Sequence, residues 1–196
     1  MATEILIVDG HPDPAPERLC RQLSTAYADG ARAAGHAVVR LDLSTADLPL
    51  LRTAEDYEHG TPPPFAADAQ AAIERAAHVV LVFPLWLGTA PALVKAFLEQ
   101  TLRPGFARER PKGRDLLGAK RLTGKSVRIV CTMGMPALAY RFYFMGHGLR
   151  NLSDNVLRFS GMGPVRWTLV GGVGTVDAAR AAREMDRMRS LGRAAR

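Results

Sequence analysis

The sequence predicts an α/β protein in which a parallel five-stranded sheet carries helices on both faces. Short runs of β-branched and other apolar residues alternate with longer stretches of helical periodicity along the chain. This alternation is typical of β-α-β units, whose crossovers are right-handed. The 196 residues contain no linker and no internal repeat, so we expect residues 1–196 to form one domain.

Short apolar runs predict the strands, at residues 5–8, 37–43, 78–83, 126–131 and 165–170. The run at 78–83 is the most apolar and is therefore expected at the centre of the sheet. Helical patterns fill most of the intervals, at residues 15–34, 65–77, 90–101, 137–159 and 177–191. Gly35 is a natural residue to end the first helix, and the polar, proline-rich stretch 49–64 is expected to be a loop.

Two arrangements are common for such a sheet, the dinucleotide-binding fold and the strand order 2-1-3-4-5 of flavodoxin-like proteins. In both of them ligands bind at the carboxyl ends of the strands, where the strand order reverses. The loops after the first, third and fourth strands are therefore the places to look for function.

The composition favours a protein of the cytoplasm. Two cysteines are too few for a disulfide framework and suggest a reducing compartment. The first residues do not form a basic and then apolar signal segment. The longest apolar stretch, 79–94, is interrupted by Pro84 and Pro91 and is too short to span a membrane.

The net charge of +7 comes largely from two basic stretches, 103–128 and 180–196. Neither stretch is interleaved with aromatic residues that could stack on bases, and no nucleic-acid-binding motif is present. We therefore expect no nucleic-acid partner. The stretches are interpreted as a solvated basic surface that also attracts an anionic cofactor or dinucleotide.

Several motifs with known chemistry are absent from the sequence. Residues 10–16 lack the glycine fingerprint of dinucleotide-binding proteins, and Gly124 is followed by a strand rather than by the helix of a phosphate loop. The five histidines show no ligand spacing and there is no CxxC pair, so no metal is expected. No nucleophile elbow of the G-x-S-x-G type occurs, which argues against a hydrolase.

The first candidate loop is His11–Cys20. A helix that begins at Pro14 or Pro16 would present free N–H groups and the positive end of its dipole to a phosphate. His11 and Arg18 would add further donors. From the residues alone, a simple turn with Arg18 in solvent is an equally good interpretation.

The second candidate loop, 84–91, places Trp86 just beyond the central strand, where a planar ligand could stack on it. Gly88 would allow a close approach of the backbone. The alternative is a core tryptophan that packs beneath the next helix.

The third candidate loop, 132–136, leads into the aromatic-rich helix predicted at 137–159. On such a helix Tyr140, Tyr143 and His147 would share one face, so that a phenol and an imidazole could pass protons to a bound ring. The alternative is an amphipathic core helix with a few polar tips.

These loops, in this order, resemble those of the flavodoxin-like NAD(P)H:quinone oxidoreductase family, which includes soluble quinone reductases and ancillary reductases of potassium-efflux systems. The resemblance rests on Leu-Ile-Val leading to His-Pro, on Phe-Pro-Leu-Trp followed by Pro-Ala-Leu-Val-Lys, and on Arg-Pro-Gly-Phe-Ala, at residues 6–12, 83–86, 91–95 and 103–107. It extends from Ile5 to about Gly174.

The resemblance implies a three-layer flavodoxin-like fold with the sheet order 2-1-3-4-5. It also implies a homodimer that uses FMN, or alternatively FAD, and takes hydride from NADPH or NADH. The acceptor would be a quinone or another small aromatic compound, such as an azo or nitro compound, and the kinetics would be ping-pong. Two alternatives are a regulatory subunit that contacts a membrane transporter and a flavin-free binding module.

The resemblance also implies roles for particular residues. The flavin phosphate would be surrounded by His11, Arg18, Leu19 and Cys20, although the family more often has serine, phenylalanine and asparagine at the last three positions. The isoalloxazine ring would lie along Pro84, Leu85, Trp86 and Leu87, with Thr132, Met133, Gly134 and Met135 at its other edge. The proton relay of the family would fall on Tyr140 and His147, with Tyr143 as an alternative.

Overall fold

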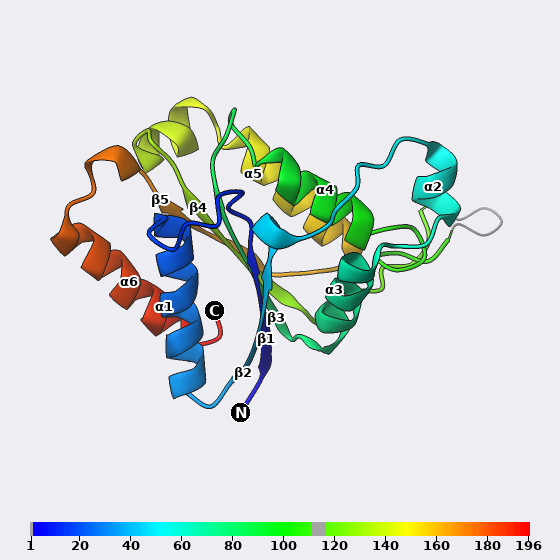
Figure 1. Ribbon diagram of the computed structural model, residues 1–196, viewed down its shortest axis with the longest axis horizontal. Helices are drawn as coiled ribbons and strands as arrows, with labels where there is room; N and C mark the ends of the chain where they lie inside the picture. Colours follow the sequence, from blue (N-terminus) through cyan, green and yellow to red (C-terminus); the bar gives the residue numbers. More distant parts are fainter. Residues whose placement is uncertain (1, 111–116) are drawn as a thin grey trace.

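The computed structural model describes residues 2–110 and 117–196 and contains one parallel sheet of order β2-β1-β3-β4-β5 (Figure 1). The strands are β1 (Glu4–Asp9), β2 (Ala37–Asp42), β3 (His78–Pro84), β4 (Ser126–Thr132) and β5 (Val165–Val170). All seven residues of the central strand β3 are buried, as its composition predicts. The α/β fold class and the order 2-1-3-4-5 are thus confirmed. Part of the basic stretch 103–128, at 111–116, lies outside the described residues.

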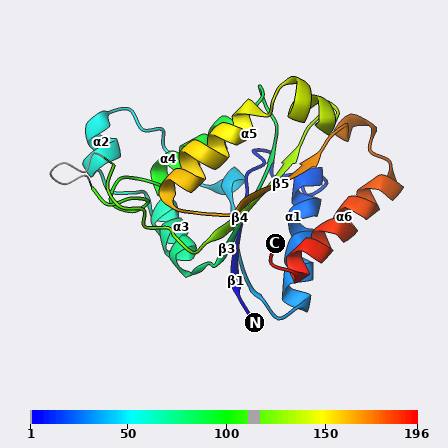
Figure 2. The same cartoon turned by 180° about the vertical axis from the view of Figure 1, so that it is seen from behind.

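Helices cover both faces of the sheet (Figures 1 and 2). One face is covered by α1 (Leu19–Ala33) and α6 (Ala178–Arg193). The other is covered by α3 (Pro64–Arg75), α4 (Ala92–Thr101), α5 (His147–Asn151) and the π-helical segment Leu152–Arg158. Alternate residues of each strand face opposite layers, so the side chains of Ile5 and Ile7 join the core beneath α1 while Leu6 and Val8 join the other core.

Helices α1 and α6 meet at two glycines. A Cβ atom on Gly30 would lie 2.0 Å from the carbonyl oxygen of Arg189, and one on Gly192 would lie 2.1 Å from the carbonyl oxygen of Tyr27. The two backbones are therefore in direct contact, because only glycine leaves room for such an approach.

Replacing Gly30 with alanine is expected to lower the free energy of unfolding by about 2 kcal/mol, because the new methyl group forces the helices apart. The sign is informative, since Gly→Ala within a helix otherwise stabilises it by about 1 kcal/mol. Urea denaturation of the variant measures the effect, with Asp29→Ala on the exposed side of α1 as the control. A Gly30→Ala variant more stable than the parent would show that the helices do not touch there.

The first helix begins later than its sequence pattern suggests. The prediction of a start at Pro14 or Pro16 is wrong, because α1 begins at Leu19 and Arg18 before it is extended, with ψ of 127°. A residue that precedes proline disfavours helical backbone, and both 13 and 15 precede prolines. Residues 11–18 therefore stay outside the helix as irregular backbone with bends and one turn, which lengthens the loop after β1.

The proline-rich stretch 49–64 is not entirely a loop. It contains the short helix α2 (Ala54–His59), which begins where the Thr53 hydroxyl accepts a hydrogen bond from the Asp56 amide at 3.0 Å. Within the described ranges, no helix combines the length and apolar character needed to cross a membrane.

Candidate functional site

The three candidate loops meet at the carboxyl edge of the sheet. The Leu85 amide donates a hydrogen bond to the carbonyl oxygen of Thr132 at 2.7 Å, which joins the second loop to the third. The Cys20 sulfur lies 3.1 Å from the Thr132 hydroxyl, which joins the start of α1 to the third loop. The rings of His11 and Trp86 meet edge to face with their centroids 6.4 Å apart. These contacts gather residues of all three loops around one site.

The first loop is shaped by His11 and Asp13. The Asp13 amide donates to His11 Nδ1 at 3.0 Å, and the Asp13 carboxylate accepts from the Ala15 amide at 2.9 Å and from Arg18 Nε at 2.7 Å. The backbone amide of Ala15, followed by Arg18, lowers the pKa of Asp13, so this carboxyl is ionised at neutral pH. Burial lowers the pKa of His11, which favours the neutral form of its ring. When Nδ1 accepts from the Asp13 amide, the proton of the neutral ring is on Nε2.

Arg21 is a site residue that sequence reasoning missed. Its guanidinium makes a bidentate ion pair with Asp42 at the end of β2, at 2.7 and 2.9 Å, and its Nε donates to the carbonyl oxygen of Asp13 at 3.0 Å. The side chain thus holds the first loop against β2. The contact joins residues far apart in the chain, and no local pattern marks it.

The backbone at the start of α1 has the character of an anion site. No side chain in the described part of the chain caps this helix, and the positive end of its dipole points out of the sheet edge. Cys20, in the first turn, is buried, and burial raises the pKa of its thiol to about 12. The thiol therefore stays protonated and is a packing group rather than a nucleophile.

The second loop contains a tight turn. Trp86 and Thr89 exchange two backbone hydrogen bonds of 2.9 and 3.0 Å around Leu87 and Gly88, whose φ angles are 48° and 80°. Two positive φ values are typical of a type I′ turn, and they cost more for leucine than for glycine. Trp86 is 49% exposed, so the interpretation of a core tryptophan is wrong. Leu87 projects into solvent.

The third loop is supported from the edge strand. The Met133 amide donates to the carbonyl oxygen of Val170 at 2.9 Å, and the Gly172 amide donates to that of Met135 at 3.0 Å. Met133 is buried, whereas Gly134 is exposed and a Cβ atom placed on it would meet nothing within 4 Å. The backbone of Gly134 is therefore open to a ligand.

The aromatic segment is not one continuous helix, and the prediction that Tyr140, Tyr143 and His147 share a face is wrong. A π-helical turn at Ala139–Tyr143 is followed by Met145 and Gly146 in the left-handed region, and only then does α5 begin at His147. Tyr140 is buried, Tyr143 is 81% exposed and His147 is exposed. The break turns these side chains in different directions.

Exposed apolar side chains crowd the second loop and the aromatic segment. This apolar rim consists of Trp86, Leu87, Leu138, Phe142, Tyr143, Phe144 and Met145. Residues 84–98 and 132–153 contain no aspartate or glutamate, so the rim is also free of negative charge. Such a surface suits flat apolar molecules or another protein surface.

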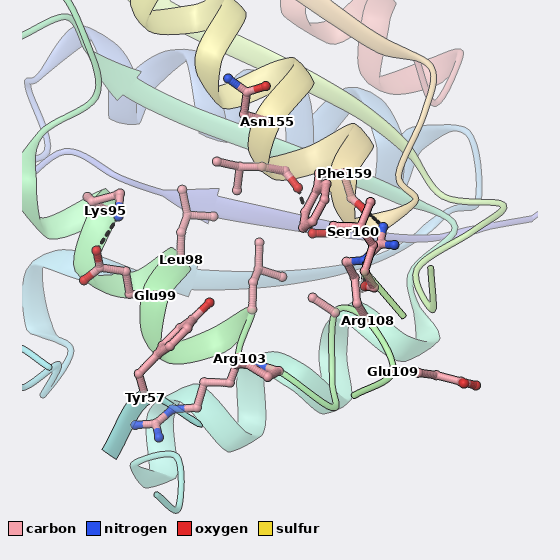
Figure 3. Close-up of a pocket in the computed structure, with 15 residues that line it drawn as sticks. Tyr57, Lys95, Leu98, Glu99, Arg103, Arg108, Glu109, Asn155, Phe159 and Ser160 are labelled. Atoms are coloured by element: carbon pink, nitrogen blue, oxygen red, sulfur yellow. Dashed lines mark hydrogen bonds and ion pairs between the residues drawn. The ribbon is translucent and has the colours of Figure 1, made fainter. Parts of the chain in front are cut away.

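A separate cavity of about 350 Å³ lies beside α4 and the segment Leu152–Arg158, away from the three loops (Figure 3). Lys95 at its edge is paired with Glu99. Arg108 stacks over the ring of Phe159 at 4.3 Å and donates to the carbonyl oxygen of that residue at 2.6 Å. These two cations are already engaged, so the cavity offers less chemistry than the loops at the sheet edge.

One protein with a related sequence and two solved structures show what the chain is similar to. It is 30% identical over 123 residues to a ribosyldihydronicotinamide dehydrogenase-like protein of Penicillium crustosum, and the match covers 60% of this chain but 42% of that protein. An NAD(P)H:quinone oxidoreductase from Methanothermobacter marburgensis superposes with a TM-score of 0.79 at 20% identity, covering 98% and 96% of the two chains. An FMN-dependent NADH-azoreductase from Bacillus anthracis, crystallised with FMN, gives 0.76 at 13% identity, covering 99% and 100%.

The family comparison covers almost the whole chain. A family model described as a flavodoxin-like fold matches residues 3–191, which include every strand of the sheet. The sheet order 2-1-3-4-5, with helices on both faces, is the arrangement of flavodoxin-like proteins. The chain therefore belongs to the family with the flavodoxin-like fold.

Proposed function

We propose that the protein is a flavin-dependent NAD(P)H oxidoreductase that passes two electrons to a quinone or a related small aromatic acceptor. The observation that carries the proposal is the uncapped start of α1, which faces the same loop cluster as the half-exposed Trp86. A phosphate site beside an open aromatic wall suits a flavin mononucleotide. The FMN-dependent azoreductase among the structural neighbours supports FMN rather than FAD.

The residues present fit the phosphate of FMN. The first amides of α1, the Nε2–H group of His11 and the guanidinium of Arg18 supply donors, and the helix dipole favours a negative charge. Asp13 opposes them, because its carboxylate is paired with Arg18 and carries a like charge to the phosphate. We therefore expect Arg18 to divide its donors between Asp13 and the phosphate.

The residues also fit the ring. A bound FMN would supply two-electron hydride chemistry between NAD(P)H and the acceptor, and we expect ping-pong kinetics. Trp86 would form a wall of the ring site, and the exposed backbone of Gly134 would offer an N–H group to the edge of the ring. Tyr143 and His147 are exposed at the rim, where they could hold and release a proton to a reduced acceptor.

The apolar rim supports a homodimer as part of this proposal. Seven large apolar side chains are exposed on two neighbouring segments, and exposed apolar residues that cluster in this way are typical of a surface that contacts another molecule. A second copy of the chain that covers part of the rim would also enclose the ring site and exclude water from it.

The first test is the absorption spectrum of the purified protein, incubated with FMN and then desalted. Bands at about 375 and 450 nm should remain with the protein, bleach when NADPH or NADH is added without oxygen, and return when a quinone follows. Heat-denatured supernatant then identifies the flavin. A protein that stays colourless after incubation with FMN and with FAD would overturn the proposed function.

A further inference from the structure

Tyr140 ties together two segments of the candidate site. Its hydroxyl donates a hydrogen bond to the carbonyl oxygen of Gly88 at 3.0 Å and accepts one from the Leu149 amide at 3.2 Å. We infer that Tyr140 is a positioning residue, which fixes the Trp86–Thr89 turn against the start of α5. Proton transfer is then left to the exposed side chains of Tyr143 and His147. The inference deepens the proposed function and rests on it for the identity of the reaction.

The hydroxyl proton of Tyr140 is already used in a hydrogen bond and is not available to a bound substrate. A tyrosine hydroxyl carries a single hydrogen, and that of Tyr140 is already donated to Gly88. The side chain is 2% exposed, so a ligand in the open part of the site does not reach it. Burial also raises the pKa of Tyr140, so the phenol keeps its proton at neutral pH.

The contact between the Trp86–Thr89 turn and the start of α5 is closely packed around this hydroxyl. A Cβ atom on Gly148 would lie 2.1 Å from the Gly88 oxygen and 2.9 Å from Thr89. Gly146 has a φ of 60°, and its amide donates to the carbonyl oxygen of Tyr140 at 3.0 Å. The Trp86–Thr89 turn and the first turn of α5 are therefore in backbone contact. The Tyr140 hydroxyl forms a hydrogen bond to each of them.

This arrangement determines where Trp86 lies. Its backbone N–H and carbonyl groups both bond to Thr89, so the indole moves with the turn. The Trp86–Thr89 turn is itself held in place by the hydrogen bond from the Tyr140 hydroxyl to the carbonyl oxygen of Gly88. Removing the hydroxyl should free the turn, and with it the proposed wall of the ring site, while the buried phenyl ring keeps its packing.

The test measures the motion of Trp86 in flavin-free protein. The chain has two tryptophans, so a Trp167→Phe background assigns the emission to Trp86 alone. In this background, Tyr140→Phe is expected to raise the amplitude of nanosecond motion in time-resolved anisotropy about twofold. Gly148→Ala should produce the same rise without touching the phenol, and Tyr143→Phe on the exposed rim is the matched control that should not.

A second measurement uses the FMN-loaded enzyme. Tyr140→Phe should lower kcat/KM for the quinone several-fold while both limbs of the pH profile of kcat keep their positions, because no titrating group is lost. Loss of a limb would make Tyr140 a proton donor and overturn the inference. An unchanged anisotropy of Trp86 in Tyr140→Phe would overturn it as well, even in a protein that binds no flavin, so its failure is distinguishable from failure of the proposed function.

Discussion

Replacing His11 and Arg18 together with alanine is expected to weaken FMN binding about 100-fold. Each side chain would contribute a hydrogen bond to a charged phosphate, and such bonds are worth about 1.5 kcal/mol or more each. The helix is unaffected, because α1 begins beyond both residues and neither side chain caps it. Fluorescence titration of the flavin measures the change.

Two matched variants sharpen this experiment. Arg32→Ala removes the same charge from the exposed far end of α1 and should leave FMN affinity unchanged. Asp13→Asn keeps the oxygen that accepts from Ala15 but removes the negative charge, so it should strengthen binding several-fold at low salt. Equal affinity of the double alanine variant and the parent protein would place the phosphate elsewhere.

Between pH 6.5 and about 4, His78 alone is expected to remove about 3 kcal/mol from the free energy of unfolding. Burial, followed by the nearby charge of Arg128, lowers the pKa of His78 to about 4. The ring stacks on Tyr27, its Nδ1 lies 2.7 Å from the Ser126 hydroxyl, and its Nε2 has no partner among the described residues. The folded protein therefore resists protonation at this ring.

The direction of this pH effect follows from comparing proton uptake at His78 in the unfolded and folded chains. Below pH 6.5 the unfolded chain takes up a proton at His78 that the folded chain refuses until about pH 4. The contribution of His78 to the free energy of unfolding is thus fully present above pH 6.5 and is lost as the pH falls towards about 4. Urea denaturation at pH 7.5 and 4.5 should show a smaller pH dependence in His78→Gln than in the parent, with the exposed His147→Gln as control. Parallel losses in parent and His78→Gln would contradict this prediction.

The sheet could be predicted from sequence because each strand is a short apolar run whose period is set by the backbone itself. The run at 165–170, for example, is β5 with the same bounds. The start of α1 could not be placed, because the ion pair of Arg18 with Asp13 and the prolines between them keep that stretch outside the helix. The periodicity of apolar residues, from which the helix start was predicted, carries no information on the ion pair or on the prolines.

The candidate site was predictable in its location but not in its internal contacts. Parallel strands bring their carboxyl ends to one edge, so the three loops had to meet there. The break at Met145 and Gly146 was harder to foresee, since methionine seldom adopts a left-handed backbone. The ion pair of Arg21 with Asp42 and the hydroxyl contact of Tyr140 with Gly88 join distant segments, so they emerge only from the packed structure.

The packing of α6 against α1 sets an order of events during synthesis of the chain. The core beneath α1 contains Ile5 and Tyr27 from the first strand and helix, together with Met188 from α6. Until residues 178–193 have been synthesised, α6 cannot cover its part of that face of the sheet, so we expect some of these apolar side chains to be exposed to water. Chaperones that recognise exposed apolar surface should therefore bind nascent chains that lack α6 more strongly than complete ones.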